Sequence, residues 1–571
     1  MMRFFLNGRD TLERTYSGAG RAFSYLSIEV RGLQAAAYIL ALSSLASSML
    51  ALVRDRVLAH LFGAGAALDV YYAAFRIPDL VFIGVGALVS AYVLIPELSK
   101  RDEAAQRRYI DGLLTWFGFL VVCAAALAAL AAPFILARLF PTLAYAHQEL
   151  VFLTRVLLLQ AVLLGFSNIA AAITQFRHRY ALYALSPIVY NLGIIYGALV
   201  LVPTHGIAGL VYGVVIGAVL HLGIQLPPLV REGWGRVSLS VPNFHEFRDT
   251  VRISLPRALA LSFGQFAFFG LLSFAAALPA GSIAVFMFAY NLQGVPLSII
   301  GASYATAAFP LLAEAHARGA ASAFLSHAAL AVRQMFFWSL PSLALIIVLR
   351  AHIVRAALGS GAFDWTDTRL TAATLALFSL SLASQGVSLL LIRAWYAAGR
   401  TLIPLVISGV NALLILLLGS AYLRIIQNAD VASFLEALLR IDNLVGTDVV
   451  VLAFAFSVAS IMGAFLLIVS IEWHFGGFLS QIKRSFWESL TAAFVAGCVA
   501  YATLQLIGDI TLLSTLASVF IKALFAGGAG ICAATFVYHL LGSREYTENA
   551  LALRRRIWRD AEPIASGEQS T

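Results

Sequence analysis

The sequence predicts an all-α polytopic membrane protein with about fourteen transmembrane helices. Of its 571 residues, 61% are hydrophobic and only 12% are charged, and the mean hydropathy is +0.88. A soluble domain is about 45–50% apolar and about 25% charged. Long apolar runs recur along the chain, and basic residues gather in alternate connections between them. This composition excludes a soluble enzyme, a disordered chain, a coiled coil and a collagen.

The apolar runs place the expected helices. A helix needs about 20 apolar residues to cross a bilayer. Runs of this kind begin near residues 33, 69, 111, 149, 182, 206, 253, 284, 326, 370, 402, 449, 487 and 516. Short loops and two polar tails account for the remainder of the chain.

The direction of the spans follows from the loop charges, because Lys and Arg are enriched in cytoplasmic loops. Basic residues gather in the N-terminal tail, after even-numbered spans and in the C-terminal tail. The exceptions are Arg350, Arg355, Arg369, Arg424 and Arg440. We therefore predict that both termini are cytoplasmic. The stretch 426–448 is amphipathic and too polar to span, so we expect a surface helix in an outer loop.

The two halves of the chain resemble each other at an offset of about 215 residues. Val70–Ile77 aligns with Val285–Leu292, and Pro96 aligns with Pro310. Six or seven helices per half in the same orientation make a parallel repeat. Transporters of this kind bind substrate between the halves, near the membrane midplane.

Enzyme motifs are missing from the sequence. It has no P-loop, no HExxH pair and no GxSxG nucleophile elbow. Cys123, Cys498 and Cys532 lie in apolar runs, so we expect neither a disulfide nor a metal site. We expect a transporter without a cofactor, driven by a monovalent cation gradient or by the membrane potential.

Charged residues in the first two spans are the first candidate site. An ionisable group inside a span costs about 2.5–3.5 kcal/mol, so it usually faces a cavity or a partner. Arg54 and Asp69 flank a short connection across which they could pair, and Arg76 lies deeper. Pro78 predicts a break in the second span, because proline lacks a donor and clashes with the preceding turn. Snorkelling of Arg54 to the interface stays open as the alternative.

Three residues of the seventh and eighth spans complete the candidate substrate site. Arg257 begins the seventh span, Gln265 follows two turns later, and Asn291 lies in the eighth. Arg257 is also placed to snorkel to the inner interface. Gln265 and Asn291 are equally suited to hydrogen bonds between helices. Both alternatives stay open.

The first two spans carry a resemblance to a known family. Ser48–Gly65 followed by Leu68–Asp79 resembles the MurJ/MviN family, within the superfamily of multidrug, oligosaccharidyl-lipid and polysaccharide exporters. Pro256–Glu314, Phe176–Asn191 and Trp395–Pro404 agree with it. The resemblance covers roughly residues 33–540.

The resemblance implies a lipid II flippase of the bacterial cytoplasmic membrane. Such a protein moves a polyprenyl-diphosphate-linked peptidoglycan precursor from the inner to the outer leaflet by alternating access. It also implies two six-helix lobes around a cationic cavity, plus two C-terminal helices. The implied domains are a tail (1–32), an N-lobe (33–248), a C-lobe (249–472), helices 13 and 14 (473–543) and a tail (544–571).

The same resemblance implies roles for the candidate residues. Arg54, Arg76 and Arg257 hold the diphosphate, because guanidinium groups match phosphate oxygens. Asp69 pairs with an arginine and helps to gate the cavity. The expected partners are the lipid-linked precursor, membrane lipids and cell-wall synthesis proteins, with no nucleic acid, and we expect a monomer.

Departures from the family pattern keep other functions open. Arginines common in the family are missing at Ser48, Phe82 and Asn291, and Arg257 and Arg155 are candidates to supply the lost charge. One alternative is a flippase for another lipid-linked oligosaccharide. A second is a cation-coupled exporter of small molecules or drugs, for which Asp69 and Asp79 are the candidate carboxylates. A third is a non-transporting scaffold in a cell-wall complex.

Overall fold

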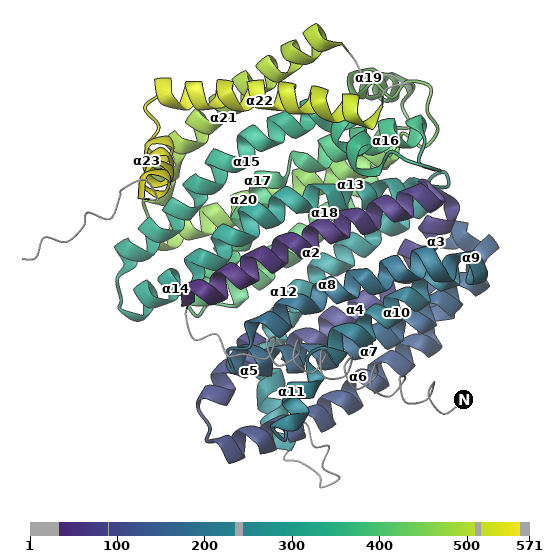
Figure 1. Ribbon diagram of the computed structural model, residues 1–571, viewed down its shortest axis with the longest axis vertical. Coiled ribbons are helices and arrows are strands. Elements are labelled where there is room, and N and C mark those ends of the chain that lie inside the picture. Colours follow the sequence, from purple (N-terminus) through teal and green to yellow (C-terminus); the bar gives the residue numbers. More distant parts are fainter. Residues whose placement is uncertain (1–32, 90, 235–243, 509–514, 560–571) are drawn as a thin grey trace, which may run out of the picture. The chain divides into compact units, whose positions relative to one another are not determined.

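The computed structural model describes residues 33–89, 91–234, 244–508 and 515–559, and these ranges contain helices and no strand (Figure 1). The first half contains α2 (Leu33–Phe62), α3 (Ala66–Ala74), α4 (Arg76–Gly86), η1 (Ala87–Val89), α5 (Ala91–Ser99), α6 (Glu103–Leu139), η2 (Pro141–Ala146), α7 (His147–Phe176), α8 (Tyr180–Tyr196), η3 (Gly197–Leu201), α9 (Val202–His205), α10 (Ile207–Gly223), α11 (Leu226–Arg231) and α12 (Phe244–Ala276). The second half contains α13 (Ser282–Leu297), η4 (Ser298–Ala302), α14 (Ser303–Ala317), α15 (Ala321–Leu358), α16 (Trp365–Ser379), α17 (Leu382–Ala397), α18 (Leu402–Ile425), α19 (Ala429–Leu439), α20 (Val449–Phe475), α21 (Phe478–Ile507), α22 (Leu516–Leu540) and α23 (Arg544–Arg559).

Each of the fourteen predicted apolar runs falls on helix, which confirms the all-α membrane fold. Among the described residues, ten helices are long and apolar enough to cross a membrane. An eleventh span results if α16 and α17, which are bent by 44° at their break, count as one. The number fourteen stays a prediction. The N-terminal tail lies outside the described residues.

The described chain separates into two compact units. The first contains the residues up to Met287 together with Ala357–Asp364, and the second contains Phe288–Ala356 and the residues from Trp365 onward. α12, the predicted seventh span, packs on α4 and α6 of the first unit. The lobe boundary near residue 248 that the resemblance implies stays a prediction.

Glycines bring α8 and η3, which continues it, into close contact with α10 in the first unit. A Cβ atom on Gly193 would lie 2.4 Å from the Cα atom of Gly217, and one on Gly197 would lie 2.5 Å from the Cα atom of Gly213. The spacing of four residues puts these glycines on one face of each helix. Small residues allow such an approach between membrane helices, where backbones pack directly on each other.

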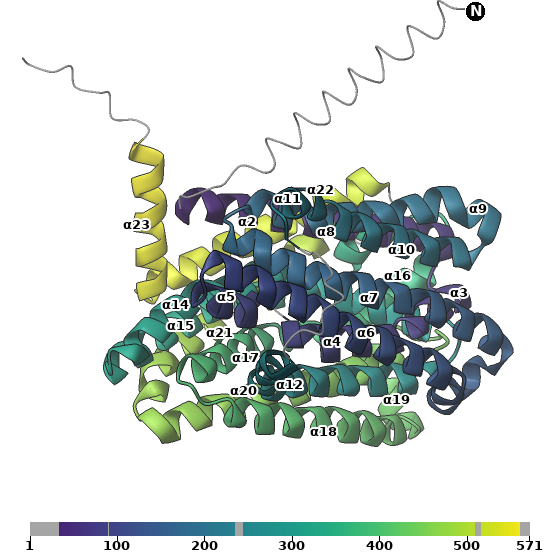
Figure 2. The ribbon, with the colours of Figure 1, turned by 90° about the horizontal axis from the view of Figure 1, so that it is seen from below.

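The second unit has a core of large apolar side chains. Trp395 of α17, Phe324 of α15 and Phe478 of α21 are fully buried there. The indole N–H of Trp395 donates to the Ser470 hydroxyl of α20 over 3.0 Å. The C-terminal helices α21 and α22 lie side by side (Figure 1). α23 stands at a steep angle to α18 (Figure 2).

Carbonyl groups that prolines leave free in three helices receive donors from neighbouring helices. In an α-helix each N–H bonds the carbonyl four residues earlier, so a proline leaves that carbonyl without its donor. Thr154 donates to Ala74, four residues before Pro78 (3.2 Å). Arg155 Nε donates to Ala129, before Pro133 (3.1 Å), and the Tyr538 hydroxyl donates to Phe337, before Pro341 (2.9 Å). These bonds matter in a bilayer because lipid offers no donor.

Two further features bear on the predicted repeat and on the predicted surface helix. η1 and η4 interrupt corresponding regions of the two halves, close to the offset that the sequence predicts. α19 confirms a helix within 426–448: it begins after Asn428, whose side chain caps Asp430 N, and ends at Arg440, which has a left-handed φ of 59°. Its placement in an outer loop stays a prediction.

Candidate functional site

The C-terminal part of α2 holds an arginine in a fixed position. Both Nε and Nη2 of Arg54 donate to Oδ1 of Asp55, at 2.9 and 2.7 Å. Nη1 donates to Asn191 Oδ1 of α8 over 3.1 Å. The Asp55 side chain is 4% exposed and that of Arg54 is 22% exposed. Asp55 is therefore buried within the protein, and it orients the guanidinium group together with Asn191.

The predicted break in the second span is confirmed, and Arg76 lies in it. α3 ends at Ala74 and α4 begins at Arg76, two residues before Pro78. Nε of Arg76 donates to the Tyr72 carbonyl over 3.0 Å, and Nη2 lies 3.3 Å from Asp79 Oδ2. Only 7% of this side chain is exposed. Arg76 thus stabilises the break itself, because it bonds a carbonyl at the end of α3.

Tyrosines lie near these two arginines. Tyr72 is an electrostatic neighbour of both Arg54 and Arg76. Tyr71 and Tyr190 are also electrostatic neighbours of Arg54. The structure therefore brings Arg54 and Arg76 into one polar cluster in the first unit. Their carboxylate partners are Asp55 and Asp79, so the two formal positive charges are matched by two negative ones.

Asp69 has a different partner from the one we expected. Its Oδ2 accepts the Gly281 N–H over 2.6 Å and its Oδ1 accepts the Ala284 N–H over 2.8 Å. These donors belong to the first turn of α13 and the residue before it. The N–H groups at a helix start lack partners within the helix and favour a negative charge. The expected pairing of Asp69 with Arg54 is therefore wrong: Asp69 caps α13.

A second contact holds the same end of α2. The backbone N–H of Ala362 donates to the His60 carbonyl over 2.9 Å. Nη1 of Arg56 donates to the Ala357 carbonyl over 3.3 Å. The segment Ala357–Asp364 belongs to the first unit through contacts of this kind. Hydropathy gave no sign of this contact, because it joins loop backbone to the end of a helix.

The remaining predicted residues of the substrate site lie on α12 and α13. Gln265 is half-buried on α12, three residues before Phe268, whose ring lies 5.6 Å from Arg76 Cζ. The side chain of Arg257 lies outside the described residues. Asn291 is half-buried on α13 within the second unit. Arg155, a candidate to supply the missing charge, is exposed and bonds the Ala129 carbonyl, and that candidate role stays a prediction.

A match to a protein-family model assigns this chain to a family. The model of the family described as lipid II flippase MurJ matches residues 58–520. This chain belongs to the MurJ family. The match includes the helix break with Arg76 and the Asp69 cap.

Individual relatives of the MurJ family agree with this assignment. The chain is 25% identical over 497 residues to the probable lipid II flippase MurJ of Buchnera aphidicola subsp. Acyrthosiphon pisum, covering 82% of this chain and 96% of that protein. The chain has the fold of a solved lipid II flippase MurJ in an inward closed conformation, with a TM-score of 0.70, 19% identity and coverage of 88% and 99%. It also has the fold of an inward-facing multidrug resistance MATE family transporter, with a TM-score of 0.62, 14% identity and coverage of 77% and 96%. It is therefore a multi-pass membrane protein.

The residues that position the arginines were not predicted from the sequence. The pattern of apolar runs and loop charges did not identify Asp55 and Asn191 as partners of Arg54. Thr154 carried no signal at all, since a threonine in an apolar helix is common. A buried acceptor next to an arginine in a span is the signal that could have identified Asp55, because a carboxylate in a membrane needs a partner.

Proposed function

We propose that this protein is a lipid II flippase, a transporter that carries a polyprenyl-diphosphate-linked peptidoglycan precursor from the inner to the outer leaflet. The observation that carries the proposal is the match to the MurJ family over residues 58–520. The relative from Buchnera is named a probable lipid II flippase MurJ. Alternating access of two lobes moves the head group, and both termini are cytoplasmic in the bacterial inner membrane.

Arg54 is the residue best suited to hold the diphosphate. Among the described residues, its guanidinium uses three of its five N–H groups on Asp55 and Asn191. The two other N–H groups and the partly exposed side chain remain for a phosphate oxygen. Arg76 is bound to Tyr72 and Asp79, so its role is to maintain the helix break beside that site. Arg257, Gln265 and Asn291 remain proposed contacts.

The balanced charge of the cluster favours a second candidate function. Asp55 and Asp79 balance the formal charges of Arg54 and Arg76, which weakens the attraction of this cluster for a diphosphate. A cation-coupled exporter of small molecules needs a carboxylate that can exchange a proton or Na⁺ for another partner. Asp79 fits this role better than Asp69, because Asp69 is bonded to backbone N–H groups of α13.

Genetic rescue tests the flippase function. The chain is expressed in a bacterium depleted of its own lipid II flippase, and growth and lysis are measured. We expect growth to be restored, and Arg54→Ala to abolish it. Arg54→Lys keeps the charge but loses the planar fork, so we expect a substantial loss there too. Arg108→Ala is the matched control, because Arg108 is exposed and lies on α6 outside the cluster.

Failure of rescue with normal membrane expression would contradict the flippase proposal. Drug-resistance assays with wild type and Asp79→Asn then test the exporter. Resistance that depends on Asp79 would establish the second function. No rescue and no resistance would leave a scaffold in a cell-wall complex, which pull-down of cell-wall synthesis proteins from the membrane would test.

A further inference from the structure

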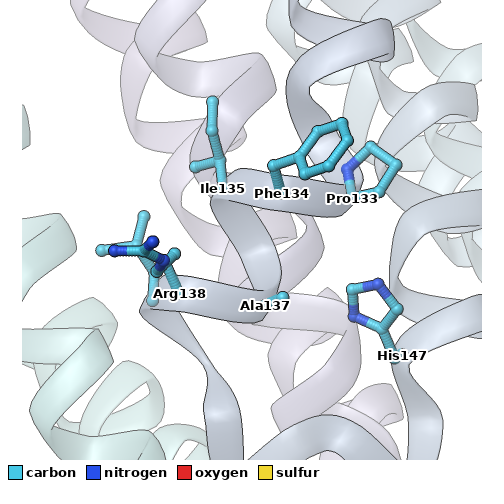
Figure 3. A pocket seen from close by; sticks show the side chains of 7 residues that line it. Pro133, Phe134, Ile135, Ala137, Arg138 and His147 are labelled. Atoms are coloured by element: carbon cyan, nitrogen blue, oxygen red, sulfur yellow. The ribbon is translucent and has the colours of Figure 1, made fainter.

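A pocket of about 800 Å³ lies at the corner between the end of α6 and the start of α7, and none of the residues that line it belongs to the arginine cluster. Pro133, Phe134, Ala137 and Arg138 of α6 line it together with His147, the first residue of α7. Figure 3 shows Arg138 and His147 on opposite sides of Ala137, with Phe134 and Pro133 above them. The pocket thus combines two nitrogen-bearing side chains with an apolar wall.

Neither polar side chain of this pocket serves the fold. Within the described residues, Arg138 and His147 make no side-chain hydrogen bond and no ion pair. Arg138 is exposed and His147 is half-buried. Both are donors toward an anion, since guanidinium carries five N–H groups and imidazole carries at least one. The Arg138 and His147 side chains can therefore donate to an anionic group while the apolar wall contacts a hydrocarbon chain, so the pocket is complementary to an amphiphilic anion.

An apolar stripe leads from the pocket along α6. Leu127, Leu130 and Phe134 are 67%, 69% and 76% exposed. Their spacing places them on the same face as Arg138. The distance from Leu127 to Arg138 along the helix is about 16 Å, close to the roughly 15 Å of one leaflet of hydrocarbon. The stripe therefore has the length of an acyl chain, and Arg138 lies at its head-group end.

We propose that this corner binds the phosphate of an anionic membrane phospholipid. Arg138 and His147 donate to the phosphate oxygens, and an acyl chain lies on Phe134, Leu130 and Leu127. On the topology that the loop charges predict, this lipid belongs to the outer leaflet. The site is separate from the Arg54 cluster, so it does not depend on the proposed transport function.

Lipid retention by the purified full-length protein tests the proposal. Native mass spectrometry measures the apparent Kd for phosphatidylglycerol and for phosphatidylcholine with the same chains. We expect selective retention of one phosphatidylglycerol, weakened about tenfold or more in Arg138→Gln/His147→Gln. Arg108→Gln, which removes an exposed charge at the other end of α6, should leave it unchanged. Equal retention by wild type and double variant would overturn the proposal.

Two further arms separate the lipid from other occupants. Leu130→Ser/Phe134→Ser removes the apolar stripe and should weaken phosphatidylglycerol binding while both donors remain. Inorganic phosphate at millimolar concentration should not displace the lipid. Full displacement by phosphate would show a simple anion site, and equal binding of phosphatidylcholine would show an apolar groove without head-group recognition. Either result would contradict the proposal.

Discussion

The Thr154 hydroxyl of α7 donates a hydrogen bond to the Ala74 carbonyl at the end of α3 over 3.2 Å. This carbonyl has no helical donor because the residue four positions later is Pro78. The bond therefore allows the second span to break next to Arg76 without leaving a buried acceptor unsatisfied. The break and its compensation lie on different helices, so both are needed to build the site.

Thr154→Val should lower the stability of the protein. Valine has the same shape but no donor, and an unsatisfied buried carbonyl costs about 1–3 kcal/mol. In a Pro78→Ala background, the backbone of the introduced alanine supplies the missing N–H, and the further loss should be close to zero. Thermal unfolding in detergent of the wild type, the two single variants and the Thr154→Val/Pro78→Ala double variant measures the coupling between positions 154 and 78. Thr491→Val is the control, since the Thr491 hydroxyl bonds a carbonyl within its own helix. If the losses of stability from Pro78→Ala and Thr154→Val were additive, the hydroxyl of Thr154 would not compensate for Pro78.

Tyr538→Phe should loosen the C-terminal helices from α15. The Tyr538 hydroxyl satisfies the Phe337 carbonyl that Pro341 leaves free, and the side chain is buried. We expect a loss of about 1–3 kcal/mol that is suppressed by Pro341→Ala. The loss is measured as a lower unfolding midpoint and as faster amide hydrogen exchange in α22. Tyr145→Phe, at a residue that is 68% exposed, should change neither; a similar loss there would point to a general effect of tyrosine removal.

Asp69→Asn should destabilise the start of α13. Asparagine has one acceptor and places an NH₂ group against a backbone N–H, so at least one charge-assisted bond is lost, worth about 1.5–3 kcal/mol. Asp102→Asn is the matched control, because Asp102 caps α6 at an exposed position where asparagine is an equally good cap. Thermal unfolding and growth rescue are measured together. Equal behaviour of the two variants would show that the Asp69 cap contributes nothing specific.

Gly193→Ala should separate α8 from α10. The new Cβ atom would lie 2.4 Å from the Gly217 Cα atom, a backbone contact that no side-chain movement relieves. Overpacking of this kind costs about 1–3 kcal/mol or more, so the yield of folded protein and its unfolding midpoint should both fall. Gly223→Ala, on α10 with nothing within 4 Å of its Cβ position, should be neutral or slightly stabilising. A neutral Gly193→Ala would contradict the close approach of the two helices.

Local signals in the sequence predicted the helices but not their contacts. Apolar runs placed the helices, and Pro78 placed the break, because both depend on neighbouring residues. Asp69 and Gly281 are 212 residues apart, and Arg54 and Asn191 are 137 apart. Such pairs depend on how helices pack, which hydropathy does not encode. The sequence therefore indicated that Asp69 needed a partner and assigned the nearest cation, whereas the folded chain supplies backbone N–H groups.

The Asp69 cap limits how often the start of α13 can be released from the first unit. α13 begins in the first unit and continues into the second from Phe288. Releasing its first turn breaks two hydrogen bonds to a carboxylate, each worth about 1.5–3 kcal/mol. A released conformation would then be rarer by a factor of roughly 10² to 10⁴, unless another contact compensates. A ligand that favours release must bind the released population more tightly by that same factor, so a single carboxylate sets the affinity difference that such a ligand has to provide.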